Sequence, residues 1–341
     1  MTVSRRKFLA GAAGVAAVST LPTFSARAAE DFIIGTYGGL YSEILDAEVI
    51  PGFEQANNVS VQKELGWGSK FIPKIIASKA NPPYDLVYVN EDESIFGDAA
   101  GLWEPMQPDA TPNIAEIYDI AKPPALPQYT CTIYEFTCAY NPEKMDAPKS
   151  WGDLWNDKIT LGVPHISSTY GMLFLQIAAE LNGGGVDNLD PGFKALEDHP
   201  SMKIYKGVTD GFGKFRQGEM DAALFYRHRV QLLIDEGLSL DFTAPSEGTY
   251  GMRTGVRVVK NSRNVEAAHD WANRAMSAAY QEAFAPKLYS PSNKTVTLDA
   301  ELAEKHVYGA EKVNSLKFGD WSVLNPKKPE LLEKWNRTFT G

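Results

Sequence analysis

Residues 32–39 read Phe-Ile-Ile-Gly-Thr-Tyr-Gly-Gly, and this stretch decides the fold class. A short apolar run ends in a tyrosine and two glycines, and from Ser42 onward apolar residues recur at helical spacing. The pattern predicts a strand, a glycine turn and a helix. Further strands are expected at 59–62 and 84–89, on either side of a helix at 70–80. This alternation predicts an α/β fold with a mostly parallel sheet, in which ligands bind outside the carboxyl ends of the strands.

The second half of the chain repeats this alternation after a β-rich stretch at 129–140. Expected strands at 159–163 and 221–225 lie on either side of an expected helix at 171–181, and another strand is expected at 255–259. We interpret 129–140 and 255–259 as two strand crossings that join two globular halves.

The chain has 341 residues, which favours two lobes over one average domain. The predicted organisation is a signal peptide at 1–28, a first lobe at 29–138 and 255–300, and a second lobe at 139–254 and 301–341. Two smaller expectations accompany it. An acidic loop is expected at 90–93 and a single helix at 265–284.

The N-terminus carries the signature of an exported protein. Arg5 and Arg6 precede an apolar stretch, 10–21, that is too short and too rich in Ala and Gly to span a bilayer. Small residues around Ala28 supply a cleavage point. The pattern predicts twin-arginine export, cleavage before Ala29 and a periplasmic location for the mature protein.

The charge balance excludes some classes of partner. The whole chain has a net charge of −10, and removing the first 28 residues leaves 29 basic against 43 acidic side chains, a net charge of −14. Nucleic acids and anionic membrane surfaces demand a basic face, so neither is an expected partner. No membrane insertion is expected either, since no segment approaches the length of a membrane helix.

Cysteine is nearly absent, with Cys131 and Cys138 as the only two. In an oxidising compartment they could bridge neighbouring strands. On one continuous strand their odd separation would direct them to opposite faces, and two buried free thiols are the alternative.

Motifs for catalysis and metal binding are missing. The five histidines are scattered singly, and the sequence holds no HExxH, paired CxxC or GxSxG motif. We expect no cofactor, no metal and no enzymatic activity. The competing hypothesis is an enzyme exported in folded form by the twin-arginine route.

A series of short motifs resembles one known family, the bacterial extracellular solute-binding proteins of ABC transporters, and most closely the branch of the spermidine/putrescine-binding proteins. Each motif is weak alone, but their shared order covers nearly the whole mature chain. They are Thr36-Tyr37-Gly38-Gly39, Tyr84-Asp85-Leu86-Val87, Gly101-Leu102-Trp103-Glu104-Pro105, Trp151-Gly152-Asp153-Leu154-Trp155, Gly218-Glu219-Met220-Asp221 and Glu247-Gly248. The resemblance implies a type II-like periplasmic binding protein, with two lobes, two strand crossovers forming a hinge, and a cleft that closes on a solute. It also implies importer membrane subunits as partners and a monomeric state.

One departure from the resembled branch bears on the ligand. Polyamine binders commonly carry a Trp-x-Asp pattern at the return crossing, whereas this chain has Arg253 and Thr254 there. In the second lobe, hydroxyls at Ser167 and Ser168 precede a helix start at Gly171, which suits an anion. These changes predict a ligand with a carboxylate as well as an amine, such as an amino acid or γ-aminobutyrate. A polyamine is the alternative.

The expected ligand-binding residues fall into three chemical groups. Aromatic side chains would wall the cleft, acidic ones would neutralise the amine, and hydroxyls and arginines would hold the carboxylate. The resemblance implies that Tyr226 stacks on the ligand and that the loop of Tyr289 reaches the cleft. Arg227 and Arg229 follow Tyr226, and one of them could hold the carboxylate through two hydrogen bonds. The full set is Tyr37, Trp67, Glu91, Asp92, Glu135, Ser167, Ser168, Tyr226, Arg227, Arg253 and Tyr289.

Overall fold

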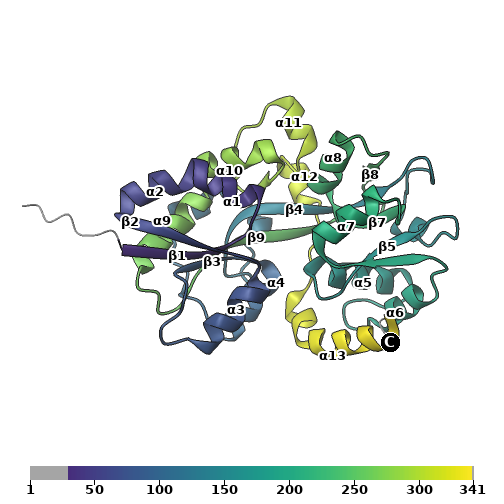
Figure 1. The fold of residues 1–341 in the computed structure, drawn as a ribbon, viewed down its shortest axis with the longest axis horizontal. Coiled ribbons are helices and arrows are strands. Elements are labelled where there is room, and N and C mark those ends of the chain that lie inside the picture. Colours follow the sequence, from purple (N-terminus) through teal and green to yellow (C-terminus); the bar gives the residue numbers. More distant parts are fainter. Residues whose placement is uncertain (1–29, 340–341) are drawn as a thin grey trace, which may run out of the picture.

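The computed structural model describes residues 30–339, so the predicted signal peptide at 1–28 lies outside the described residues. Figure 1 shows two lobes side by side, joined by long strands that run through the middle of the molecule. All strands belong to one sheet with the order β2-β1-β3-β9-β4-β7-β5-β6, while β8 and β10 pair with β4.

The first lobe is built on three parallel strands. They are β1 (Glu30–Thr36), β2 (Val59–Leu65) and β3 (Leu86–Asn90). β1 pairs with β2 from Glu30↔Val59 onward and with β3 at Ile34↔Leu86. Phe32 and Ile34 are fully buried, since alternate side chains of a strand point to the same face of the sheet.

Helices cover both faces of this part of the sheet (Figure 1). The helix expected after residues 32–39 is continuous from α1 (Leu40–Ile44) through a π-helical turn η1 (Leu45–Val49) to α2 (Ile50–Asn57). The other helices of this lobe are α3 (Gly68–Ala77), α4 (Glu91–Ala99), α9 (Val265–Ala275) and α10 (Ala278–Phe284).

The second lobe repeats the plan with β5 (Leu161–Pro164), β6 (Met202–Tyr205) and β7 (Ala222–Tyr226), in which β5 lies parallel to both neighbours. Its helices are α5 (Thr169–Leu181), α6 (Asp190–Glu197), α7 (Gly207–Arg216) and α8 (Arg227–Asp235). Nearly every residue of α5 from Thr169 to Ala179 is buried, which makes α5 the central helix of this lobe.

Two long strands join the lobes. β4 (Tyr129–Tyr140) and β9 (Tyr250–Val258) pair with each other antiparallel, and β9 also pairs with β3 while β4 pairs with β7. These are the two strand crossovers that the sequence predicts, and together they form the hinge. The residue boundaries assigned to the lobes stay a prediction.

The C-terminal part adds short strands and helices. β10 (Ser290–Pro291) and β8 (Asp241–Thr243) border β4. Three helices end the described chain, α11 (Ala300–Lys305), α12 (Ala310–Asn314) and α13 (Trp321–Phe339). α13 packs against α4 of the first lobe as well as α6 of the second, so it bridges the lobes.

Three local expectations need correction or completion. Residues 90–93 are not a loop, because Asn90 caps α4 in a capping box with Glu93. The helix expected at 265–284 is two helices, since Ser277 accepts a hydrogen bond from the Tyr280 amide and starts α10. Cys131 and Cys138 lie on the same strand, β4, and both are buried free thiols.

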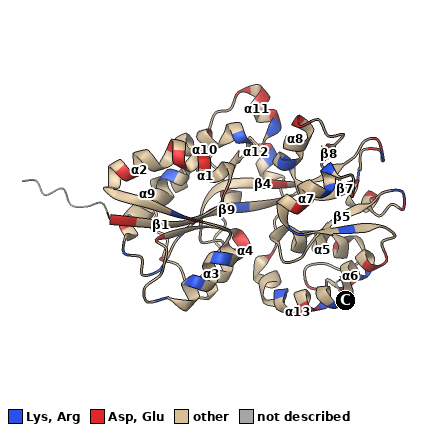
Figure 2. Cartoon of the chain, viewed as in Figure 1, with Lys and Arg blue, Asp and Glu red and all other residues tan. Residues whose placement is uncertain are grey.

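Charged residues of both signs are interspersed along the elements of both lobes (Figure 2). Within residues 30–339, none of the helices combines the length and apolar character that a bilayer crossing requires.

Candidate functional site

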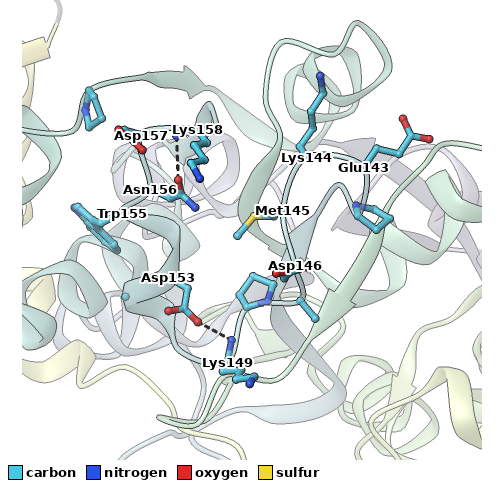
Figure 3. A pocket seen from close by; sticks show the side chains of 15 residues that line it. Glu143, Lys144, Met145, Asp146, Lys149, Asp153, Trp155, Asn156, Asp157 and Lys158 are labelled. Carbon is cyan, nitrogen blue, oxygen red and sulfur yellow. Dashed lines mark hydrogen bonds between the residues drawn. The ribbon is translucent and has the colours of Figure 1, made fainter.

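A wide surface hollow of about 950 Å³ lies at the outer end of the second lobe. Figure 3 shows its lining side chains pointing in different directions. Two of them, Asp153 and Asn156, accept hydrogen bonds from the amides of Lys149 and Lys158, which are local turn contacts. No set of polar groups converges there, so this hollow is a weak candidate for the site.

A smaller pocket of about 200 Å³ lies where a doubly wound fold is expected to bind its ligand. Its walls come from the residues that follow β1, β2, β3, β6 and β7, and from the two crossing strands. The lining residues are Tyr37, Gly38, Tyr41, Trp67, Asn90, Tyr134, Val208, Thr209, Phe212, Tyr226, His228, Arg229, Met252 and Tyr289.

The first lobe contributes an aromatic wall. Tyr37 follows β1 and Trp67 follows β2, and their ring centroids lie 5.0 Å apart. Trp67 is 56% exposed, unlike most large apolar side chains of this protein. The Tyr37 hydroxyl donates to Asn90 Oδ1 at 3.3 Å, at the carboxyl end of β3. The ends of β1, β2 and β3 therefore contribute the rings of Tyr37 and Trp67 and the Asn90 side-chain amide to the pocket.

The second lobe contributes the turn from β7 into α8. Tyr226 is the last residue of β7 and the N-cap of α8, and His228 and Arg229 lie in the first turn of that helix. The Tyr226 and His228 ring centroids are 5.6 Å apart. Tyr134 of β4 stacks on His228 at 5.1 Å, so strand and helix meet at the pocket.

The charge in this pocket is unusually simple. Arg229 is the only charged side chain in the lining, and no carboxylate accompanies it. Burial lowers the pKa of His228 well below its usual value, and nearby Arg229 and His306 lower it further, so the imidazole is neutral at pH 7. Burial also raises the pKa of Tyr134 and Tyr226, so both phenols stay protonated.

Four of the expected site residues meet in this pocket: Tyr37, Trp67, Tyr226 and Tyr289. All four are aromatic. The other seven do not line it: Glu91, Asp92, Glu135, Ser167, Ser168, Arg227 and Arg253.

Arg253 is placed away from the pocket because the protein supplies its partner. Its Nη1 lies 2.5 Å from Glu91 Oε2, its Nε donates to the Ile120 carbonyl at 2.7 Å, and its guanidinium stacks 3.4 Å from the Phe318 ring centroid. Burial raises the pKa of Glu91 to about 7, although Arg253 opposes this shift. In this structure Arg253 and Glu91 therefore hold each other, and neither lines the pocket.

The acids Asp92 and Glu135 are also occupied within the protein. Asp92 is 3% exposed, accepts from Thr169 Oγ1 at 2.9 Å and lies 3.5 Å from Lys328 Nζ. Glu135 pairs with Arg227 at 3.1 Å. Arg227 therefore has the internal partner that Arg229 lacks.

The two serines perform the local role that short polar residues have at helix starts. Ser168 Oγ accepts from the Gly171 amide at 3.1 Å and caps α5. Ser167 Oγ lies 2.8 Å from His165 Nδ1. Both serines therefore form their hydrogen bonds outside the pocket. The helix whose first turn contributes an arginine to the pocket lining is α8.

Several lining residues were missed by the sequence reasoning. Tyr41 and Phe212 lie within helices, and Tyr134 lies within a crossing strand. In a sequence, an aromatic residue at such a position is interpreted as part of the hydrophobic core. His228 lies two residues after Tyr226, and its position near a strand end was the available signal, whereas the sequence already offered Arg229 as an alternative to Arg227. No group of three His, Cys, Asp or Glu side chains within residues 30–339 could hold a metal ion.

Comparison with known proteins adds independent evidence. The family model described as "Bacterial extracellular solute-binding protein" matches residues 48–308. An uncharacterized protein of Haemophilus influenzae is 26% identical over 230 residues, which are 64% of this chain and 65% of that protein. The chain therefore spans just under two thirds of the length of this curated relative.

Two solved structures match over almost their full length. A 1.85 Å crystal structure of an ABC transporter from Clostridium perfringens is 27% identical, with a TM-score of 0.78, covering 90% of this chain and 99% of that one. A periplasmic binding protein from Actinobacillus pleuropneumoniae with fructose-6-phosphate bound is 23% identical, with a TM-score of 0.71 and coverage of 91% and 99%.

The family match covers well over half of the chain, and the two lobes and two crossing strands are those of the periplasmic binding protein fold. This agreement confirms the family and fold that the sequence motifs predict. It does not resolve the polyamine branch. The chain belongs to the bacterial extracellular solute-binding proteins.

Proposed function

We propose that this protein is the solute-binding component of an ABC importer and that it captures a small organic solute carrying an anionic group. The observation that carries the proposal is Arg229. Within the described part of the chain this guanidinium forms no ion pair, and it lines an aromatic pocket that contains no acid.

The comparison with the other two arginines sharpens this argument. Arg227 and Arg253 each pair with a glutamate of the protein, whereas the only side-chain hydrogen bond of Arg229 within residues 30–339 goes to the Tyr289 hydroxyl at 3.5 Å. A guanidinium in a closed, largely apolar cleft is costly without a counter-charge. A ligand anion removes this cost and can accept two N–H groups at once.

The same pocket bears on the two ligand classes that the sequence suggests. An amino-carboxylate fits the proposed class, since its ammonium can lie against the faces of Tyr37 and Trp67. A polyamine has only cationic groups, and the lining offers it an arginine and no carboxylate. The observed lining therefore favours the amino-carboxylate over putrescine or spermidine.

The test is calorimetry on the mature chain, preceded by a thermal-shift screen of amino acids, γ-aminobutyrate, other organic anions and polyamines. A bound ligand at 100 times its Kd stabilises the protein by about 2.7 kcal/mol, which a thermal shift detects. We expect Arg229→Ala to lose at least tenfold in affinity for the ligand found. Arg227→Ala, which removes a neighbouring but internally paired arginine, is the matched control. Binding of a polyamine that is unchanged in Arg229→Ala would refute the proposal.

Export by the twin-arginine route is part of this proposal. It is supported by Arg5 and Arg6 before the apolar stretch at 10–21. Mass spectrometry of periplasmic protein from an export-competent host should give a mature chain that begins near Ala29. Full-length cytoplasmic protein in that host would contradict it, and turnover of the ligand by pure protein would restore the enzyme hypothesis.

A further inference from the structure

Three largely buried rings of the pocket carry polar groups that form no hydrogen bond within the described residues. The hydroxyls of Tyr134 and Tyr226 and the imidazole of His228 form none within residues 30–339, although the side chains are only 8%, 7% and 7% exposed. Buried polar groups are normally paired. These three polar groups line the pocket, so a bound ligand can supply the partner that the described residues do not.

These three rings form a nearly equilateral triangle. The ring centroids are 5.6 Å apart for Tyr134 and Tyr226, 5.1 Å for Tyr134 and His228, and 5.6 Å for Tyr226 and His228. Arg229 follows His228 directly and acts electrostatically on all three. Three rings from β4, from the end of β7 and from α8 therefore meet at one place in the pocket lining.

The pocket is rich in donors and poor in acceptors. The Asn90 Oδ1 atom is already engaged, because it accepts from Tyr37 at 3.3 Å and from Thr254 at 2.8 Å. Both phenols are protonated, and a neutral imidazole donates through one nitrogen. A ligand group that fits this inventory must accept hydrogen bonds from several directions.

The start of α8 adds positive potential to the same place. This nine-residue helix has no side-chain cap at its N-terminus, and its first turn carries Arg227, His228 and Arg229 with no acid. Basic residues in a first turn oppose the helix macrodipole. The arrangement is explained if an anion binds there, since the unpaired first-turn amides and Arg229 then stabilise the same charge.

We propose that the triangle of Tyr134, Tyr226 and His228, together with Arg229, selects a head group with three free oxygens, of the phosphonate or phosphate-monoester class, over a carboxylate. This rests on the proposed function, since it specifies the anion at the same site. A carboxylate is planar and its acceptor sites lie in that plane, so it meets donors that come from three different elements less well than a tetrahedral group does. An unpaired buried donor lowers affinity. A tetrahedral head directs one oxygen toward each ring and leaves its charge beside Arg229.

The experiment compares probes that differ only in the head group. Calorimetry on the mature chain would measure 2-aminoethylphosphonate against 3-aminopropanoate, and ethylphosphonate against propanoate. We expect the phosphonate of each pair to bind at least tenfold more tightly. In Tyr226→Phe and in His228→Phe this ratio should fall toward one, because the phosphonate loses a donor that the carboxylate does not fully use.

Tyr170→Phe is the matched control. Its ring lies 5.2 Å from Tyr226, but Tyr170 does not line the pocket, so the ratio should stay at the wild-type value. The melting temperature of each unliganded variant shows that it is folded, and Tyr134→Phe replaces any variant that is not.

The outcomes are distinct. Tighter binding of the carboxylates would overturn this inference and leave the proposed function intact, whereas binding of neither anion would overturn both. A phosphonate preference that survives in Tyr226→Phe and His228→Phe would remove the triangle from the explanation.

Discussion

Replacing Asp92 by alanine should open the unliganded protein, although this residue lies outside the pocket. Asp92 stands in the first turn of α4 in the first lobe, and its partners Thr169 and Lys328 belong to α5 and to α13, which packs on the second lobe. The side chain therefore ties the two lobes together in this conformation, and opening the cleft must break its contacts.

The size of the effect follows from these contacts. A buried hydrogen bond from Thr169 to a charged acceptor contributes roughly 1.5–3 kcal/mol. Lys328 is 28% exposed and 3.5 Å away, so its ion pair adds only about 0.5 kcal/mol. The Asn325 bond goes to the Asp92 backbone carbonyl and survives the substitution. A loss of about 2–3 kcal/mol shifts the balance between closed and open forms by roughly 30- to 150-fold.

Small-angle scattering of the unliganded mature chain measures this shift directly. Asp92→Ala should have a larger radius of gyration than the wild type, and any ligand found in the screen should bind more weakly and compact the variant. Asp198→Asn is the control, since it breaks an exposed pair with Lys194 on the second lobe alone. Equal radii of gyration and equal affinities for Asp92→Ala and the wild type would refute the reasoning.

Two further predictions concern stability. Burial raises the pKa of Glu93 to about 8, above its value of about 4.5 in the unfolded chain, so the folded state binds more protons between these values and stability should fall as pH rises from 4.5 to 8. The free energy of unfolding, measured by urea unfolding at several pH values, should fall by at most about 1.4 kcal/mol per pH unit. The fall should be shallower in Glu93→Gln, and an identical slope in both proteins would contradict the assignment to Glu93. A Cβ at Gly171 would lie 2.2 Å from the His165 carbonyl oxygen, so Gly171→Ala should cost about 2–4 kcal/mol, whereas Gly213→Ala in α7 meets nothing within 4 Å and should be neutral or mildly stabilising. Equal melting temperatures for the two glycine variants would contradict the packing argument.

The sequence predicted the fold well because the strands carry strong local signals. The apolar run at 32–36 and the β-rich stretch at 129–140 became β1 and β4 with nearly the expected bounds. The prediction of a loop at the acidic run 90–93 was wrong for a physical reason. Acids look solvated in a sequence, but in the first turn of a helix they satisfy the amides and the macrodipole, and here they are largely buried.

The candidate site was only partly predictable from the sequence. The aromatic lining residues could be predicted, whereas the charged residues could not. Tyr37, Trp67 and Tyr226 line the pocket because a residue after a strand end faces the cleft in this fold. Charged residues cannot be assigned in this way, since their role depends on a partner far along the chain. Arg253 pairs with Glu91, 162 residues away, and Arg227 pairs with Glu135, 92 residues away. Only the folded structure shows which arginine remains without a partner.

The pairing of β4 with β9 has a mechanical consequence. The two strands are hydrogen-bonded from Tyr129↔Val256 to Phe136↔Tyr250, so they form one paired β-ribbon and not two independent connections. Such a ribbon resists lateral sliding, because sliding would break the ladder, but it twists with little strain. We therefore expect motion of one lobe against the other to be a rotation about this strand pair. Such a rotation would bring Tyr37 and Trp67 on one side and Arg229 on the other back to the same mutual alignment whenever the cleft closes.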